Sequence, residues 1–273
     1  MSVQNDGALA WCDTPRDVVL VQGDDAAEFL HSQLAQDLKS LDVGSSAHSL
    51  LLEPSGHVVA LLRVVRHVDT VFTLDTDSGL GDAVMTRLKK FILRSKVAMR
   101  RSDWVVRSYF GTGARDVGSG VVGCASRWWG GVDDVDIIGD AATLPVAGTK
   151  MSHVDYDVRR VDAGWPTVGC DIDVGDLPAT TGILRVAASF SKGCYPGQEL
   201  VERMDSRGSS APVQLVVAPA SEVGDVGSYV IVDGTEVGVV TSRGLERALV
   251  RVKRGAEVSE FWVRPDRFAE SLL

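Results

Sequence analysis

The sequence has few cysteines and histidines, and none of them forms a recognisable metal-binding or disulfide-rich motif. Its four cysteines include no CxxC pair, and its five histidines include no HxxxH pair. Structural zinc sites need such closely spaced ligands, and small disulfide-stabilised folds need a high density of cysteine. The sequence therefore predicts neither a tightly bound metal nor a disulfide framework.

Long hydrophobic runs are also missing. The most apolar segment, residues 58–65, is interrupted by Arg63 and is far too short to cross a bilayer. The opening residues, MSVQNDGALAWCDTPRD, carry acidic side chains early and contain no apolar stretch typical of a signal peptide. We therefore expect a cytoplasmic protein with no membrane association.

Positive charge is scarce as well. The chain has 28 basic and 37 acidic residues and a net charge of −9, whereas proteins that bind nucleic acid through phosphates usually have a basic excess. Direct nucleic-acid binding is therefore not expected. A local basic patch would have to come from residues that are mostly expected on solvated strand faces: Arg243, Arg247, Arg251, Lys253, Arg254 and Arg264.

What remains is the composition of an ordinary globular protein, with 45% hydrophobic and 24% charged residues in a chain of 273, long enough for two domains. Residues 17–23 predict a strand, and Asp24 or Asp25 then begins a helix. This helix is expected to be amphipathic and to pack on a sheet, because leucines follow one stripe. They are Leu30, Leu34, Leu38 and Leu41.

Residues 56–67 and 71–75 predict a hairpin with a turn at Asp69, and residues 96–100 and 104–110 predict two further strands. Between these pairs, residues 80–93 predict a second helix. Its inward-facing side chains are expected to be Leu80, Val84, Leu88 and Phe91. A helix over about 152–163, closed by Gly164, is expected later in the chain.

After Gly208 the pattern changes to short apolar segments, at residues 213–218, 228–232, 236–242, 248–252 and 260–264. Asp233-Gly234 is typical of a two-residue type I′ hairpin turn. Five such strands predict a small antiparallel barrel, so the chain is expected to divide into residues 1–210 and a C-terminal β-barrel over 211–273.

The segment SKGCYPGQELVERMDSRG, residues 191–208, contains a cysteine between two glycines. Gly193 and Gly197 permit unusual backbone angles and close approach of a ligand. A helix beginning near Gln198 would direct its N–H groups toward the Cys194 thiol, and Lys192 adds positive charge, so both favour the thiolate. The segment thus makes Cys194 a candidate reactive residue.

Other interpretations of this segment stay open. A free cysteine is commonly a small buried hydrophobic residue. A cysteine hydrolase would need a histidine base, and none lies near Cys194 in the sequence. Glu199 and Arg203 have the spacing of an ordinary surface ion pair on a helix.

The segment YDVRRVDAGWP, residues 156–166, places Asp162 near the end of a predicted helix. A carboxylate there could accept two parallel hydrogen bonds from a planar N–H/NH₂ edge such as that of a pterin. It could equally be a solvated carboxylate at a helix end or a partner of Arg159.

Together these segments resemble the YgfZ-type folate-binding proteins of the glycine-cleavage T-protein (aminomethyltransferase) superfamily. The main match is K-G-C-Y-x-G-Q-E, from Lys192 to Glu199. The other matches follow in order along nearly the whole chain: V-x-G-D-D-A-x-x-F-L-x-x-Q from Val21 to Gln33, P-S-G-H from Pro54 to His57, R-V-D-A-G-W-P, Arg207-Gly208, and G-T-E-V-G-V-V-T-S from Gly234 to Ser242.

The resemblance implies an α+β fold of three subdomains around a central channel that holds tetrahydrofolate or a one-carbon derivative. Two subdomains are α+β, the first discontinuous in sequence, and the third is a C-terminal antiparallel β-barrel. The residues that it assigns to folate binding are Asp162, Tyr156, Lys192, Arg16, Gln198 and Glu199, with Cys194 as the tentative catalytic residue. Asp162 stands where T-proteins have a glutamate. Lys192 is either a partner of the folate carboxylates or a solvated lysine.

One departure from the T-proteins bears on activity. They carry an acidic segment whose carboxylate assists aminomethyl transfer, and the corresponding positions here are Ala60 and Leu61. The expected acid–base group is therefore missing. The resemblance then implies a tetrahydrofolate-binding protein that uses Cys194 to support iron–sulfur enzymes as its clients, with indirect effects on tRNA modification. The alternative is a folate-dependent methyl- or aminomethyltransferase.

Overall fold

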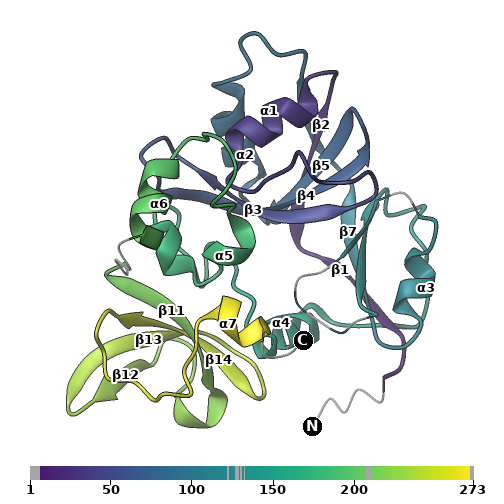
Figure 1. Ribbon diagram of the computed structural model, residues 1–273. Coiled ribbons are helices and arrows are strands. Elements are labelled where there is room, and N and C mark those ends of the chain that lie inside the picture. The colour runs from purple at the N-terminus through teal and green to yellow at the C-terminus, as the bar shows by residue number, and fades with distance from the viewer. Residues whose placement is uncertain are drawn as a thin grey trace. The chain divides into compact units, whose positions relative to one another are not determined.

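The computed structural model describes residues 7–206 and 211–270, apart from positions 122, 127, 128, 130 and 132 (Figure 1). The chain forms two compact units. The first consists of Met1–His31, Leu38–His48 and Leu62–Tyr156, and the second of Ser32–Asp37, Ser49–Leu61 and Asp157–Leu273. Both units are therefore assembled from segments that are not contiguous in sequence.

One five-stranded sheet has the order β10-β1-β7-β9-β8. Its strands are β1 (Ala10–Thr14), β7 (Val105–Phe110), β8 (Cys124–Ser126), β9 (Val135–Gly139) and β10 (Thr149–Lys150). Strand β1 pairs antiparallel with β7 and parallel with β10. The short helix α3 (Ala114–Gly118) contacts β7 and β9. The core of this part centres on Trp11, Tyr109 and Ile137.

A second five-stranded sheet has the order β3-β4-β5-β2-β6. Its strands are β2 (Arg16–Gln22), β3 (Ser46–Leu52), β4 (Val58–Val68), β5 (Val71–Asp77) and β6 (Ala98–Ser102). The strand predicted at 17–23 and the predicted hairpin are thus confirmed, with Asp69 in the turn between β4 and β5. These strands carry long apolar stretches because most of their side chains are buried.

Helix α1 (Ala26–Gln33) is shorter than the leucine stripe predicts, although the leucines beyond it remain buried. The carbonyl oxygens of Leu34 and Gln36 accept hydrogen bonds from the Lys192 ammonium, at 2.7 and 3.1 Å. The Ala35 N–H donates to a carbonyl of β3 at 3.1 Å. A continuing helix would use these same backbone groups for its own bonds. The prediction of one helix through residue 41 is therefore wrong.

Helix α2 (Gly81–Lys89) packs against β2, β5 and β6, and it also ends earlier than predicted. Val84 and Leu88 are fully buried, as expected from the pattern. Phe91 lies beyond the helix end and is 41% exposed, so its predicted inward position is wrong. The Arg87 guanidinium instead covers one face of its ring, at 4.6 Å from the ring centre.

The C-terminal strands form an open four-stranded sheet in the order β11-β14-β13-β12. They are β11 (Val213–Pro219), β12 (Tyr229–Val232), β13 (Thr235–Arg243) and β14 (Arg247–Lys253). Asp233 and Gly234 have φ angles of 48° and 75°, which confirms the predicted hairpin turn because type I′ requires two positive values.

The predicted closed barrel is not confirmed, because no closed sheet forms among the described residues. The expected fifth strand at 260–264 makes only a single bridge, from Val263 to Val217. The Trp262 N–H donates to the Ser259 carbonyl in a turn, and α7 (Pro265–Glu270) begins directly after this segment. A turn and a helix on either side leave no room for an extended strand.

The remaining helices connect the sheets. They are α4 (His153–Asp162), α5 (Leu184–Ala187), α6 (Gln198–Ser206) and the 3₁₀ helices η1 (Pro178–Thr181) and η2 (Ala220–Glu222). Helix α4 matches the prediction at 152–163, and Gly164 follows it at φ 72°. The Arg207-Gly208 pair and most of the proposed boundary near 209–212 lie outside the described residues. The division at residue 210 therefore stays a prediction.

The described residues contain neither a membrane-spanning helix nor a cluster of metal-binding side chains. None of their helices has the length and apolarity that crossing a membrane requires. None of their histidine, cysteine, aspartate and glutamate side chains form a group of three or more that could hold a metal ion.

Candidate functional site

The cysteine loop, residues 192–197, belongs to the second unit and leads into helix α6 (Figure 1). Cys194 is exposed and free, while the next residue, Tyr195, is 6% exposed. The helix begins at Gln198, as predicted. The loop thus presents its thiol to solvent between a buried aromatic side chain and a buried lysine.

Two glycines fix the course of this loop. Gly197 has φ 89°, and a Cβ there would lie 2.9 Å from Gly56 Cα and 3.0 Å from the Glu53 carbonyl oxygen. Gly56 has φ 91°, and a Cβ there would lie 2.6 Å from Leu200 Cβ. Both positions therefore need glycine for backbone angle and for space. The Pro54–His57 turn and the cysteine loop, two motifs far apart in sequence, meet at this contact.

Lys192 holds the loop from the other side. It is 8% exposed, and its ammonium donates to the carbonyl oxygens of Leu34 and Gln36. The same ammonium lies 5.0 Å from the centre of the Tyr195 ring, a cation–π distance. The structure thus makes Lys192 a buried link between the cysteine loop and the segment after α1. The solvated lysine considered from the sequence is excluded.

We expect Lys192→Met to lower the free energy of unfolding by about 2–4 kcal/mol, because two hydrogen bonds from a charged donor are lost and two carbonyls are left unsatisfied. Urea unfolding followed by circular dichroism would measure this loss. Lys253→Met is the matched control, because that lysine is exposed and bonds to one surface carbonyl. A Lys192 variant as stable as the control would contradict the role of Lys192 as a link.

Gln198 and Glu199 have their polar groups bonded within or next to α6. The Gln198 side-chain oxygen accepts the Tyr195 N–H at 3.3 Å, and its nitrogen donates to Glu202 at 2.6 Å. Glu199 pairs with Arg203 at 2.7 Å, and both side chains are well exposed. The surface ion pair considered from the sequence is therefore what the structure shows. An exposed pair of this kind adds little stability.

Tyr195 sits beside Cys194 with its hydroxyl buried and without a hydrogen-bond partner in the described part of the chain. Burial, with a smaller contribution from the nearby Glu202 carboxylate, raises the pKa of this phenol to about 12. The phenol is therefore neutral at physiological pH. Its role next to the thiol is to anchor the loop rather than to exchange protons.

Asp162 closes the turn between β13 and β14. Its Oδ1 accepts the backbone N–H groups of Glu246 and Arg247, both at 2.9 Å, and its Oδ2 accepts that of Leu245 at 3.3 Å. A Cβ on Gly244 would lie only 2.1 Å from Oδ1, so the turn and the carboxylate fit closely. A carboxylate offers about four acceptor positions, and three are occupied here.

The neighbouring arginine in the same helix, Arg160, is 3% exposed and contacts the fully buried Asp171 at 2.9 Å. Asp171 also accepts hydrogen bonds from Thr241 and Ser242 of β13, at 2.7 and 2.6 Å. Burial lowers the pKa of the Arg160 guanidinium, but the Asp171 and Asp157 carboxylates outweigh burial and raise it. This cluster joins α4 to the C-terminal sheet and keeps the Asp162 turn in place.

Arg16 and Tyr156 belong to the first unit and lie near each other. Arg16 forms ion pairs with Asp75 and, at 2.9 Å, with Asp77. Burial lowers the pKa of Arg16, but these two carboxylates outweigh it and raise the pKa, with a smaller contribution from Tyr156. Of the six residues predicted to bind folate, Arg16 and Tyr156 are the two that belong to the first unit.

Tyr156 is half-buried within an aromatic group. Its ring centre lies 6.1 Å from that of Phe110 and 5.5 Å from that of Trp129, both in edge-to-face arrangements. Such contacts favour a fixed ring orientation. Tyr156 therefore offers a rigid aromatic surface in the first unit.

Arg63 was not predicted to have a role, because in the sequence it only interrupts an apolar strand. Arg63 is 2% exposed and donates to Asp75 at 2.9 Å and to Asp136 at 2.6 Å. Because Asp75 lies on β5 and Asp136 on β9, this arginine links a strand of each five-stranded sheet. A charged residue within each of three apolar strands is the pattern that would have revealed it.

The chain is similar in sequence to several bacterial proteins. It is 26% identical to an uncharacterized protein of Haemophilus influenzae, over 72% of this chain and 69% of the relative. It is 26% and 27% identical to proteins named tRNA-modifying protein YgfZ from Cronobacter sakazakii and Enterobacter sp. strain 638, over 70% of this chain and 65% of each relative. The chain thus spans about two thirds of the length of these relatives. No protein-family model matches it.

Its fold is similar to that of the glycine cleavage system aminomethyltransferase T from Bartonella henselae, with a TM-score of 0.74 and 20% sequence identity. The alignment covers 92% of this chain and 80% of that protein. The chain is YgfZ-like in sequence and T-protein-like in fold. The fold class predicted from the sequence is thereby confirmed in its mixed α and β character.

In this YgfZ-like chain the two positions expected to be acidic in T-proteins are deeply buried. Ala60 is fully buried and Leu61 is 2% exposed, and both belong to β4. The neighbouring Val58 and Val59 are buried as well. An acidic side chain at these positions would lie in an apolar environment, which is costly without a partner.

The four cysteines of the YgfZ-like chain differ in accessibility. Cys12 is buried, Cys124 is half-buried, and Cys170 and Cys194 are exposed. Burial and nearby carboxylates, Asp136 and Asp171 respectively, raise the pKa values of Cys124 and Cys170. The Cys170 thiol also donates to the Thr241 carbonyl at 3.3 Å. Cys194 is therefore the exposed cysteine that lies in the motif.

Proposed function

We propose that this chain binds tetrahydrofolate or a one-carbon derivative and uses Cys194 to support iron–sulfur enzymes, with an indirect effect on tRNA modification. The observation that carries the proposal is the cysteine loop, which exposes one thiol on a backbone held by Gly56, Gly197 and Lys192. The T-protein-like fold and the relatives named tRNA-modifying protein YgfZ support the folate and tRNA parts.

The candidate folate-binding residues do not fit a ligand equally well. Tyr156 offers a rigid aromatic surface to a pterin, and Asp162 has about one acceptor position left for its N–H edge. Asp162 is therefore the folate contact that the proposal tests, and the contact of Tyr156 with folate stays a prediction. The polar groups of the other candidates are bonded within the protein, and we propose that they hold the surrounding backbone. They are Arg16, Lys192, Gln198 and Glu199.

Tetrahydrofolate binding can be tested by titration calorimetry with two Asp162 variants. We expect Asp162→Ala to weaken binding by about 1.5–3 kcal/mol, the usual contribution of a charge-assisted hydrogen bond. Because alanine also removes the acceptors of the β13–β14 turn, Asp162→Asn is the informative second variant. Its single oxygen can still accept the Glu246 and Arg247 N–H groups, which both bond to Oδ1.

The asparagine variant should fold normally, yet it should bind tetrahydrofolate more weakly than the unmodified protein does. The matched control is Asp155→Asn on the same helix, which should bind as the unmodified protein does. Equal affinity of all three proteins would remove Asp162 from the folate site. No binding by the unmodified protein would refute the folate part of the proposal.

We expect no appreciable aminomethyl transfer to tetrahydrofolate, even when the other glycine-cleavage components are supplied. The physical reason is the absence of a carboxylate at Ala60 and Leu61, which removes the expected acid–base group. An assay of methylenetetrahydrofolate formation, with a glycine-cleavage T-protein as positive control, would measure this. Turnover on the order of 1–10³ per second would favour the alternative of a folate-dependent aminomethyltransferase.

A further inference from the structure

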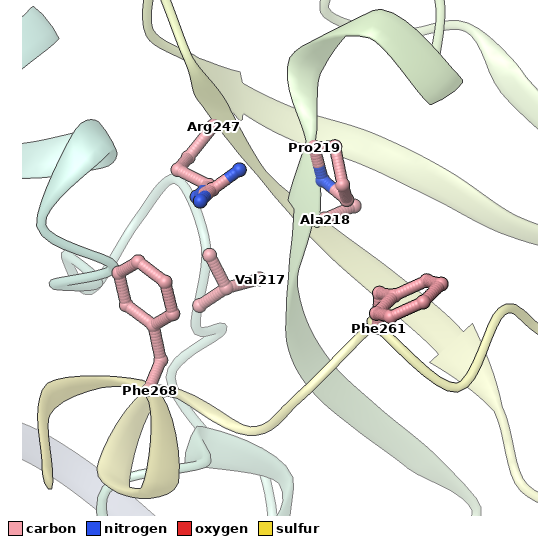
Figure 2. Close-up of a pocket in the computed structure, with 6 residues that line it drawn as sticks. All are labelled: Val217, Ala218, Pro219, Arg247, Phe261 and Phe268. Carbon is pink, nitrogen blue, oxygen red and sulfur yellow. The ribbon is translucent and has the colours of Figure 1, made fainter. Parts of the chain in front are cut away.

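The C-terminal part of the second unit contains a pocket that none of the proposed folate or cysteine residues line. Its volume is about 250 Å³. Pockets for drug-sized ligands are usually larger, roughly 300–1,000 Å³, so this one fits a ligand with a single ring. Its lining residues are Val217, Ala218, Pro219, Arg247, Phe261 and Phe268 (Figure 2).

The walls of the pocket are held in place by backbone contacts. Val217 and Val263 exchange two backbone hydrogen bonds, at 2.7 and 3.2 Å, which fix the segment carrying Phe261 and Phe268 against β11. A Cβ on Gly164 would lie 2.8 Å from the Phe268 ring and 2.9 Å from Val217. Phe268 therefore packs directly on the chain after α4, and this contact holds one wall of the pocket in place.

Arg247 brings a positive charge to this pocket. Its backbone N–H is fixed by Asp162, and its guanidinium lies over the Phe268 ring at 5.5 Å. Figure 2 shows the guanidinium between Phe268 and Pro219. Among the described residues, no carboxylate lies within ion-pair distance of it. The planar guanidinium can therefore donate hydrogen bonds to an anion bound in the pocket.

Two aromatic rings accompany this charge. Phe268 and Phe261 lie on opposite sides of Val217 (Figure 2), and Phe261 is 71% exposed. An exposed phenylalanine beside an apolar floor gains buried area when a ring covers it. A guanidinium matches a carboxylate with two parallel hydrogen bonds. The pocket therefore combines the groups that recognise a ring and a carboxylate on one small molecule.

We propose that this pocket binds a single-ring aromatic carboxylate, with the carboxylate on Arg247 and the ring between Phe261 and Phe268. None of its lining residues is a proposed folate contact, although Asp162 holds the backbone N–H of Arg247. Its ligand is defined by negative charge, by one planar ring and by the small volume available.

Benzoate is the probe for this site, and benzamide is its neutral counterpart of equal size. In titrations followed by NMR of the full chain, benzoate should bind at least about tenfold more tightly than benzamide. Arg247→Gln should remove this difference. Arg254→Gln, which removes one exposed positive charge elsewhere on the same part of the chain, should preserve it.

The ring contacts need a separate variant. Phe261→Ala should weaken the binding of both ligands by several-fold, and because Phe261 is largely exposed this variant is expected to fold. Equal affinity for benzoate and benzamide would overturn the proposal, and so would benzoate binding that Arg247→Gln leaves unchanged. Displacement of benzoate by tetrahydrofolate would also overturn it, by assigning the pocket to folate.

Discussion

Cys194→Ser is expected to abolish the support of iron–sulfur enzymes in cells while leaving the fold and the folate affinity nearly unchanged. Serine is close to cysteine in size, and the side chain is exposed, so little packing is lost. The hydroxyl has neither the nucleophilicity nor the redox chemistry of a thiol. The measurement is the activity of an iron–sulfur enzyme in a strain that depends on this chain for it.

Cys170→Ser is the matched control, because Cys170 is the other exposed cysteine and belongs to the same unit. This variant should support the enzyme fully. Alkylation of the unmodified protein gives an independent check, since Cys194 should react before Cys12, Cys124 and Cys170. Full activity of Cys194→Ser would mean that the motif acts through its backbone, with Gly193 and Gly197 as its important members.

Arg63→Met is expected to destabilise the protein by about 3–5 kcal/mol at neutral pH, the usual cost of removing one partner from a buried ion pair. Asp75 is fully buried and Asp136 is 4% exposed, so water cannot replace the guanidinium. Arg16 would remain as a charged partner of Asp75, and the Ser108 hydroxyl would still donate to Asp136 at 2.6 Å. Urea unfolding at pH 7 would measure the loss.

The loss should depend on pH in a definite direction. Burial alone raises the pKa of Asp75, but Arg63 and Arg16 outweigh burial and hold it below its ordinary value of 3.8. A carboxylate with a depressed pKa stabilises the fold above its unfolded-state pKa, and this stability is lost as the pH falls. In Arg63→Met this contribution of Asp75 is reduced. The difference in unfolding free energy between the unmodified protein and the variant should therefore become smaller below about pH 4.

Arg66→Met is a suitable control on the same strand. Arg66 pairs with Asp69, whose side chain is 83% exposed and stays hydrated without its partner, and it donates one further hydrogen bond to the Leu41 carbonyl at 2.8 Å. We expect this control to lose much less stability than Arg63→Met and to show no comparable dependence on pH. A loss at Arg63 no larger than that at Arg66 would show that the buried network contributes little.

Local patterns in the sequence predicted much of the fold. The Asp233-Gly234 turn, the β4–β5 hairpin and the start of α6 at Gln198 each depend on residues close together in the chain. The early end of α1 could not be predicted in this way, because it depends on Lys192, which lies far along the sequence. The spacing of leucines in one segment cannot show that a lysine far along the chain donates to the carbonyl groups of that segment.

In the candidate site, too, features that depend on neighbouring residues were predicted, whereas contacts between distant residues were not. The exposed thiol and the two glycines followed from one short motif, whereas the partner of Gly197 is another glycine, Gly56, in a distant turn. The family resemblance assigned Asp162 to folate binding, but no pattern in the sequence predicted that it accepts the N–H groups of a hairpin turn. Those partners become visible only when the chain is folded.

The interleaved course of the chain has a consequence for its biosynthesis and its breakdown. The second unit takes residues 32–37 and 49–61 from the early part of the sequence but most of its mass from residue 157 onward. These early segments therefore cannot complete their packing during synthesis until much later residues have been made. One of these later residues is Gly197, which packs on Gly56. For the same reason, no single proteolytic cut can release either unit whole, and a gene fragment that encodes only the cysteine motif would lack the turn that shapes its loop.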